Sequence, residues 1–424
     1  MSSWADQWRK DFPALRPRGK GAAGYLDSAC LTLVPRPVLD AMEGYYADTP
    51  GCGGRSVHRW STAVTEAVEV AREEFGRYFG ADPAHLVTLR NTTEAINLVG
   101  RGLGLRKGDR VLVTDQEHNS NLVIWQVLAR TLGIRLDVLP LPEDRAFDLD
   151  AYRRNLARPT RLVSVFHSSN LDGRTLPARE LVEIAHEAGA EVLLDGSQYA
   201  PHERLDLTQL GVDYYALSLH KMLGPSGTGL LYGAPGKLER LAPLVVGGET
   251  VAWTDYRDHE PLPVPARFEA GLQNYAGIVG ARAAVQYLGK VDMDELRDHM
   301  VRLQRIAADT LSTEGVRLLG LPDHRARGSI FSFILEGVDA HDVALFLDEG
   351  YDTLVRSGMN CVHSWYRARG LDGSVRASFY LYTTEDEVRR FRDGVAELAR
   401  LTQGRRKASP PTRAVPQRKR VRAR

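Results

Sequence analysis

The stretch EVLLDGSQYAPHERLDLTQLGVDYYALSLHKMLGPSGTG (residues 191–229) decides the fold. It holds two short apolar runs, EVLLDG at 191–196 and DYYALSL at 213–219, with a longer polar segment between them. Three similar runs precede it, namely LVTLR at 86–90, RVLVTD at 110–115 and RLVSVF at 161–166. Helical patterns lie between the runs, and this alternation predicts an α/β fold whose mainly parallel sheet is flanked by helices. Ligands of such sheets bind at the carboxyl ends of the strands, so the polar residues that follow each run are the candidate functional residues.

The pattern changes after Gly277. Helical patterns at about 279–290 and 294–313 are followed by GSIFSFILEG, a helix near 340–349, VRASFYLY and a final helix near 384–402. These elements predict a smaller α+β C-terminal domain. We therefore divide the chain into an N-terminal arm (1–24), a large domain (25–278), a small C-terminal domain (279–404) and a tail (405–424).

Composition limits the class of protein. The chain has 424 residues, 43% hydrophobic and 26% charged, which is enough for one large or two closely packed domains. We find neither a signal peptide nor a run of about 18 apolar residues, so we expect no membrane span and a cytoplasmic protein. The three cysteines, Cys30, Cys52 and Cys361, are too few for a disulfide framework and favour a reducing compartment.

Charge is distributed unevenly along the chain. The net charge is +1, yet residues 405–424 contain nine basic residues and no acidic one, so the rest of the chain is acidic. This tail also contains three prolines and few apolar residues, which is typical of disorder. A solvated extension is the favoured interpretation, and binding of nucleic acid or a partner protein is the alternative.

Two residues near the ends of the decisive runs carry the first functional signal. Asp195 ends EVLLD, and Lys221 follows the next run. Gly224, Gly227 and Gly229 come next and indicate that the backbone passes close to something bulky there. The glycines do not form a phosphate-binding P-loop, because GPSGTG lacks Gly-Lys-Ser/Thr. Taken alone, Lys221 could be a solvated strand end.

Other polar groups occur in matching places. The segment 91–94 (Asn-Thr-Thr-Glu) has the form of a capped helix start, whose free N–H groups and hydroxyls suit a phosphate. His118 follows the run RVLVTD and offers a flat ring. Each group alone has an ordinary structural explanation, as a helix cap or a surface histidine. Together with the amine of Lys221 and the anion of Asp195 they are the parts of a pyridoxal 5'-phosphate (PLP) site.

At these residues the chain resembles the class V aminotransferase-like PLP enzymes of fold type I. Within them it is similar to the group II cysteine desulfurase/selenocysteine lyase branch. The resemblance runs from about Tyr25 to Leu401. The matching segments are YLDSAC, SVHR, RNTTEAINLV, EHNSN, HSSN, DGSQ, SLHK, RFEAG, VRSG followed by Met-Asn-Cys, and VRASFYLY.

The resemblance implies a role for each residue of the PLP site. Lys221 would bind the cofactor covalently, and Asp195 would contact its pyridinium nitrogen. Gln198 would contact the ring hydroxyl, and His118 would stack on the ring and shuttle protons. The phosphate would be bound by Thr93, Ser218 and His220, with Thr92 nearby.

The resemblance also implies how substrate binds and reacts. Asn170 and Arg376 would orient the substrate carboxylate, for which the planar fork of arginine is suited. Without the resemblance we would place Arg376 on a surface strand. Cys361 stands five residues after Arg356, at the position of the nucleophilic cysteine. A lone cysteine is often a buried small hydrophobe, but this one lies in a polar, glycine-containing loop that favours exposure and reactivity.

Four further residues receive weaker assignments. Cys30 and Cys52 lack the paired spacing of a zinc site, and we expect no metal and structural or incidental roles for both. His58 and Arg59 match a segment that resembles a loop reaching the active site at a dimer interface. An ordinary polar loop explains them equally well.

The chain departs from the family pattern at four positions. Leu272 stands where the family typically has a threonine that binds the phosphate of the partner subunit. Asn119 follows His118 where a second histidine is common, and Met359 and Asn360 precede Cys361 where histidines are often found. These departures leave the substrate and the sulfur acceptor open.

The resemblance implies a homodimeric, PLP-dependent cysteine desulfurase. It would convert L-cysteine to L-alanine, form a persulfide on Cys361 and pass the sulfur to an acceptor protein, with iron–sulfur cluster assembly as one use. The alternative is another class V PLP enzyme, such as a C–S lyase, selenocysteine lyase, epimerase or aminotransferase, with Cys361 as a bystander. A binding module that acts through the basic tail is the least favoured hypothesis.

Overall fold

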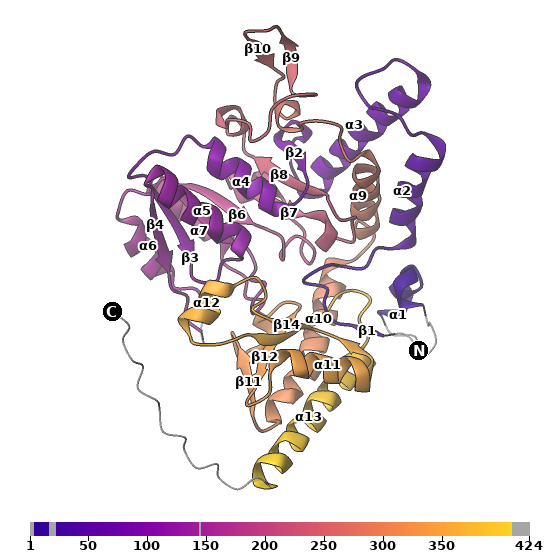
Figure 1. Ribbon diagram of the computed structural model, residues 1–424, viewed down its shortest axis with the longest axis vertical. Helices are drawn as coiled ribbons and strands as arrows, with labels where there is room; N and C mark the ends of the chain where they lie inside the picture. The colour runs from indigo at the N-terminus through magenta and orange to yellow at the C-terminus, as the bar shows by residue number, and fades with distance from the viewer. Residues whose placement is uncertain (1–3, 17–22, 144–145, 409–424) are drawn as a thin grey trace, which may run out of the picture.

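A seven-stranded sheet forms the centre of the computed structural model, which describes residues 4–16, 23–143 and 146–408 (Figure 1). The strand order is β2-β8-β7-β6-β5-β3-β4. The strands are β2 (Leu86–Leu89), β3 (Arg110–Thr114), β4 (Arg135–Leu139), β5 (Leu162–Phe166), β6 (Glu191–Asp195), β7 (Tyr214–Ser218) and β8 (Gly229–Gly233). Only β8 runs antiparallel to its neighbours β2 and β7. The α/β prediction is confirmed, and all five predicted strands lie in this sheet.

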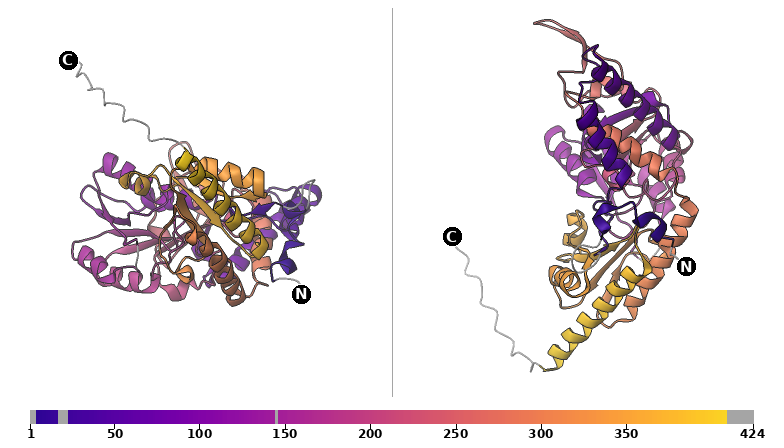
Figure 2. Two further views of the ribbon diagram at one scale, coloured as in Figure 1. Left: turned by 90° about the horizontal axis from the view of Figure 1, so that it is seen from below. Right: turned by 90° about the vertical axis from the view of Figure 1, so that its right-hand side faces the viewer.

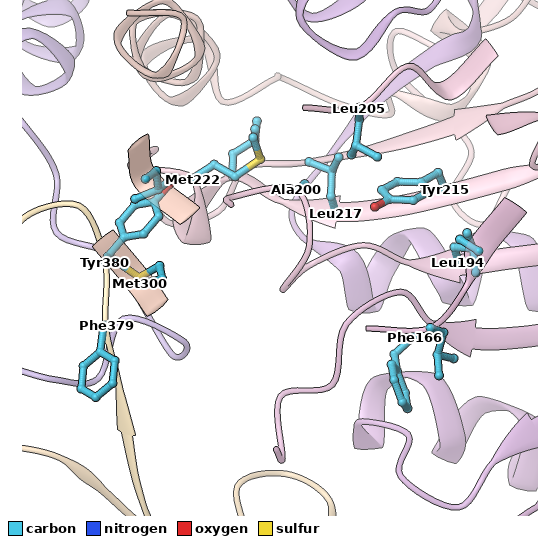
Figure 3. Close-up of a cluster of buried hydrophobic side chains, with 14 of the residues drawn as sticks. Phe166, Leu194, Ala200, Leu205, Tyr215, Leu217, Met222, Met300, Phe379 and Tyr380 are labelled. Carbon is cyan, nitrogen blue, oxygen red and sulfur yellow. The ribbon is translucent and has the colours of Figure 1, made fainter. Parts of the chain in front are cut away.

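Helices cover both faces of the sheet because alternate strand residues point to opposite sides. Val192 and Leu194 of β6 belong to a core under α7 and α9, whereas Leu193 belongs to a second core under α4 and α5. The helices of this region are α2 (Arg36–Asp48), α3 (Arg59–Phe79), α4 (Thr92–Gly102), α5 (Asn119–Leu132), α6 (Leu149–Leu156), α7 (Ala178–Glu187), α8 (Leu207–Leu210) and α9 (Tyr275–Leu288). Figure 3 shows that the first core continues from Leu194 and Tyr215 of the sheet to Met300 and Tyr380 of the C-terminal part.

The C-terminal part contains a four-stranded antiparallel sheet of order β11-β12-β15-β14. Its strands are β11 (Val316–Leu319), β12 (Ile330–Leu335), β14 (Arg356–Gly358) and β15 (Ser374–Ser378). Its helices are α10 (Met293–Ala308), α11 (Ala340–Tyr351), α12 (His363–Ala368) and α13 (Glu385–Ala408). The expected division after residue 278 falls inside α9, which packs against α2 and α3. The division into domains stays a prediction.

The N-terminal residues contact the C-terminal part at two places. Helix α1 (Asp6–Arg9) lies in the predicted arm, and Arg9 Nη1 donates a hydrogen bond to Glu387 at 3.0 Å. The two-residue strand β1 (Gly24–Tyr25) pairs in parallel with β13 (Thr353–Leu354). Residues 409–424, most of the predicted basic tail, lie outside the described residues. None of the described helices is long and apolar enough to cross a membrane.

Candidate active site

One cavity of about 210 Å³ brings the predicted site residues together. It lies at the carboxyl ends of β6 and β7, beside the first residues of α4 and α5, and it is closed by the small sheet. The predicted residues that line it are Thr92, Thr93, His118, Asn170, Asp195, Gln198, Ser218, His220, Lys221, Cys361 and Arg376. Their proximity is therefore a finding, while their individual roles stay predictions.

Lys221 and Asp195 form the centre of the cavity. Lys221 ends a 3-10 turn (Leu219–Lys221) that directly follows β7. Burial lowers the pKa of the Lys221 amine, and the nearby carboxylate of Asp195 offsets part of this effect. A lowered pKa favours the neutral amine, which is the form that reacts with a carbonyl and accepts a proton. Asp195 is buried, and Ser197 N donates to its Oδ1 at 3.0 Å.

Two of the glycines after Lys221, Gly224 and Gly229, let backbone segments pack closely. A Cβ on Gly229 would lie 2.6 Å from Asn91 Cα and 2.8 Å from Leu217 O. Glycine at this position therefore lets β8 lie between β7 and the segment that begins α4. The bulky neighbour expected from the sequence is the protein backbone itself.

Three hydroxyls gather at the start of α4. Thr92 Oγ1 lies 2.6 Å from Ser197 Oγ and 2.7 Å from Ser218 Oγ. Thr92 N also donates to Ser218 Oγ at 2.9 Å, and Asn91 caps the helix by accepting from Glu94 N. The predicted capped start is thus confirmed. Hydroxyls at a helix N-terminus suit an anion such as phosphate. Ser197 is not among the predicted residues, although it stands inside the quoted segment DGSQ.

His118 begins α5 and is neutral. Its Nδ1 accepts a hydrogen bond from Ser120 N at 3.1 Å, which leaves Nε2 to carry the proton. Burial lowers the pKa of His118 to about 3, and the positive charges of Lys221 and Arg376 act in the same direction. The ring is therefore an uncharged imidazole at neutral pH, the form suited to stacking on another ring.

Arg376 is fully enclosed and not a surface residue. It lies on β15, where Nη1 donates to Asn170 O at 3.0 Å and Nη2 to Asp27 Oδ1 at 3.1 Å. Gln198 Nε2 donates to Ala29 O at 2.7 Å. The two bonds of Arg376 to Asn170 and Asp27 fix the guanidinium at the wall of the cavity, where a carboxylate can reach it.

Cys361 lies on a short, tightly held loop between β14 and α12. Asn360 and Cys361 have φ angles of 47° and 59°, in the left-handed region that side chains disfavour. Asn170 Nδ2 donates to Asn360 O at 2.6 Å, and Asn119 N donates to Cys361 O at 2.7 Å. The Asn119 side chain also lies 2.8 Å from His363 Nδ1. Backbone groups of Asn119 and Asn360 therefore take part in the bonds that hold this loop in place.

Two further side chains complete the cavity: Arg356, which was not predicted, and Cys30, whose loop we expect near the entrance of the active site. Arg356 Nη1 donates to Cys30 Sγ at 2.7 Å, and its Nη2 to Cys361 Sγ at 3.6 Å. Arg356 was visible in the segment VRSG, but nothing in its spacing indicates two sulfur partners. Cys30 and Cys361 are both half-buried, whereas Cys52 is exposed and does not line the cavity. The expectation that Cys30 is incidental does not account for this position.

The remaining candidates lie away from the cavity. His58 caps α3 by accepting from Ser61 N at 3.3 Å, and both His58 and Arg59 are exposed. Leu272 is 62% exposed and lines a different cavity together with Glu269. Among the described residues, no group of three or more His, Cys, Asp and Glu side chains could hold a metal ion.

The chain is similar to known proteins over most of its length. A probable cysteine desulfurase of Pseudomonas aeruginosa is 38% identical over 388 residues, covering 91% of this chain and 96% of that protein. One of Halalkalibacterium halodurans is 36% identical over 390 residues, covering 91% and 95%. The apo structure of cysteine desulfurase from Thermococcus onnurineus NA1 superposes with a TM-score of 0.89 at 31% identity and covers 94% of this chain and 99% of that one.

A second solved structure gives the same result. The cysteine desulfurase CsdA (S-sulfonic acid) from Escherichia coli has a TM-score of 0.85 at 32% identity, with coverage of 94% of this chain and 98% of that one. The family model described as Aminotransferase class-V matches residues 24–391. With this match and relatives of 36–38% identity over nine-tenths of its length, the chain belongs to the class-V aminotransferase family.

Proposed function

We propose that the protein is a PLP-dependent cysteine desulfurase that converts L-cysteine to L-alanine and collects the sulfur on Cys361. The observation that carries this proposal is the meeting of Lys221 and Cys361 in one cavity. Lys221 comes from the end of the large sheet, and Cys361 comes from a loop of the small one. An amine for the cofactor and a thiol for the sulfur thus face the same space.

The residues of the cavity suit PLP. The hydroxyls of Thr92, Ser197 and Ser218 at the start of α4 would hold the phosphate, and Lys221 would bind the carbonyl carbon. Asp195 is a buried residue that lines the cavity, and no donor of the described residues contacts its Oδ2, so this oxygen is free for a pyridinium N–H. Bound PLP supplies an electron sink that lets a substrate lose its Cα proton.

The protein groups have separate tasks in this reaction. The Arg376 guanidinium binds the substrate carboxylate. The Lys221 amine, whose pKa is lowered by burial, accepts the Cα proton. The Cys361 thiolate attacks the substrate sulfur, so that an S–S bond forms while the C–S bond breaks. Arg356 stabilises the thiolate through its contact with Cys361 Sγ. His118, whose Nδ1 accepts from Ser120 N, offers its Nε2–H to the cavity as a hydrogen-bond donor.

We further propose that two chains assemble into a homodimer. A hairpin of β9 (Val251–Thr254) and β10 (His259–Pro261) projects from the large domain (Figures 1 and 2). Apolar side chains on and near it are exposed, including Val245, Val246, Trp253, Tyr256 and Leu272. Exposed apolar groups of this size favour a protein interface. We also propose that the protein is cytoplasmic and that it passes its sulfur to an acceptor protein of iron–sulfur cluster assembly.

One experiment tests the proposed reaction. Purified protein supplied with PLP, L-cysteine and a reductant should release sulfide and alanine in equal amounts. Cys361→Ala should release little of either, and Cys52→Ala should match the wild type because Cys52 lies outside the cavity. Pyruvate and ammonia as products, or full alanine release by Cys361→Ala, would favour the C–S lyase alternative.

A further inference from the structure

Two cysteines of the cavity share one guanidinium. The terminal nitrogens of Arg356 contact Cys30 Sγ at 2.7 Å and Cys361 Sγ at 3.6 Å. Because a guanidinium is compact and planar, both sulfurs lie next to the same small group. The proposed reaction uses only Cys361 and assigns no role to the Cys30 thiol.

Positively charged groups surround the two sulfurs. Arg356, Arg376 and Lys221 all line this cavity and carry or can carry positive charge. A thiolate next to a guanidinium in a partly exposed, electropositive site is the reactive form of cysteine.

Both sulfurs are presented by ordered backbone. The Cys361 loop is held by hydrogen bonds to Asn360 O and Cys361 O. On the other side, Cys30 N donates to Asp27 O at 3.0 Å, and Ala29 N donates to Ser378 Oγ at 2.9 Å. Hydrogen-bonded backbone therefore positions both thiols next to Arg356.

We propose that Cys30 is a second sulfur carrier, which takes the terminal sulfur of the Cys361 persulfide. The proposal rests on the proposed function, since that reaction supplies the persulfide. The Cys30 thiolate attacks the terminal sulfur, so that a new S–S bond forms at Cys30 and the S–S bond at Cys361 breaks. The electron pair of the broken bond returns to Cys361 Sγ, which becomes a thiolate, and the proton stays on the transferred sulfur, now bound to Cys30.

This exchange needs no external oxidant or reductant, because one thiolate and one persulfide replace another pair. Arg356 contacts the attacking sulfur and the leaving sulfur, so the negative charge stays beside the same cation throughout. Cys361 is then free for a second substrate while Cys30 holds the first sulfur for the acceptor.

The test follows extra sulfur on each cysteine. Holoenzyme is mixed with a stoichiometric amount of L-cysteine without acceptor or reductant, quenched with an alkylating reagent at increasing times, and its cysteine peptides are analysed by mass spectrometry. The mass of one sulfur atom should appear first on Cys361, then on Cys30, and not on Cys52. This measurement needs no substitution, so it does not depend on how a variant folds.

Substitutions test whether Cys30 receives its sulfur from the Cys361 persulfide or directly from the substrate. Cys30→Ser should carry sulfur on Cys361 alone. With an excess of L-cysteine, its first burst of alanine should be about half that of the wild type, because one sulfur-holding thiol remains. Cys361→Ser should show no sulfur on Cys30. Cys52→Ser is the matched control and should behave as the wild type.

Three outcomes would contradict sulfur transfer from Cys361 to Cys30. Cys30 could stay unmodified while Cys361 carries extra sulfur, or Cys30 could gain sulfur in Cys361→Ser. The third outcome is that Cys52 gains sulfur as fast as Cys30. A wild type with no sulfur on Cys361 would instead overturn the proposed function and this sulfur transfer with it.

Discussion

Asn360 should control how well Cys361 is placed. Its φ of 47° lies in the left-handed region, which costs most residues about 1–2 kcal/mol and asparagine less. Its Nδ2 donates to Ser374 Oγ at 3.1 Å and to Gly358 O at 3.2 Å, and each such bond contributes about 1 kcal/mol. Asn360→Ala should therefore destabilise the loop by about 3 kcal/mol. Asn360→Gly should cost about 1 kcal/mol less, because glycine tolerates this φ.

The assay is the rate at which Cys361 gains sulfur in a single turnover, followed with the melting temperature. A misplacement of about 1 Å at a reacting atom can cost about a hundredfold in rate. We expect Asn360→Ala to lower the rate tenfold to a hundredfold, which spans that magnitude, and Asn360→Gly to lower it less. Asn119→Ala is the control, since it removes only the exposed contact to His363 and keeps the backbone bond to Cys361. Unchanged rates of sulfur gain in both Asn360 variants would show that Asn360 does not place Cys361. Equal losses of rate in the two variants would show that backbone strain at residue 360 does not contribute.

Three further predictions concern the cofactor, the nucleophile and the buried histidines. Lys221→Ala should lose the visible absorbance of covalently bound PLP, and Asp195→Ala should keep PLP but lose most turnover; normal turnover would show that Asp195 is misassigned. Cys361→Ala should impair turnover of L-cysteine more than that of selenocysteine, whose weaker C–Se bond needs less help, as product assays can check. Burial lowers the pKa of His167 to about 3, so folding stability should fall as pH drops below about 6.5. His167→Gln should remove about 2 kcal/mol of that loss by pH 5, measured by denaturant unfolding.

The fold could be predicted where burial makes the sequence pattern clear. The runs at 162–166, 191–195 and 214–218 are buried along their whole length and read as strands. The strands β4 and β8 are not among the predicted ones. Most of β4 is partly exposed because it lies at the sheet edge, and β8 begins and ends with glycine. Neither sequence therefore has the continuous apolar run that indicates a central strand.

The site could be predicted only where a residue follows a strand or matches a family segment. Asp195 and Lys221 are of this kind. Ser197, Cys30 and Arg356 act through neighbours that are far away in the sequence, such as the 326 positions between Cys30 and Arg356. Sequence spacing carries no information on such pairs, because they depend on how the small sheet docks against the large one.

The charged residues that line the cavity affect the pKa of His118. Arg356 and Arg376 face the single carboxylate of Asp195 among the residues that line it, so the site carries excess positive charge before a thiol ionises. That excess is one reason why the pKa of His118 is as low as about 3, after the larger effect of burial. Phosphate, carboxylate and thiolate groups that enter the cavity reverse this excess and raise the pKa of His118. We therefore expect His118 to take up a proton more readily when anionic reactants fill the site than when the site is empty.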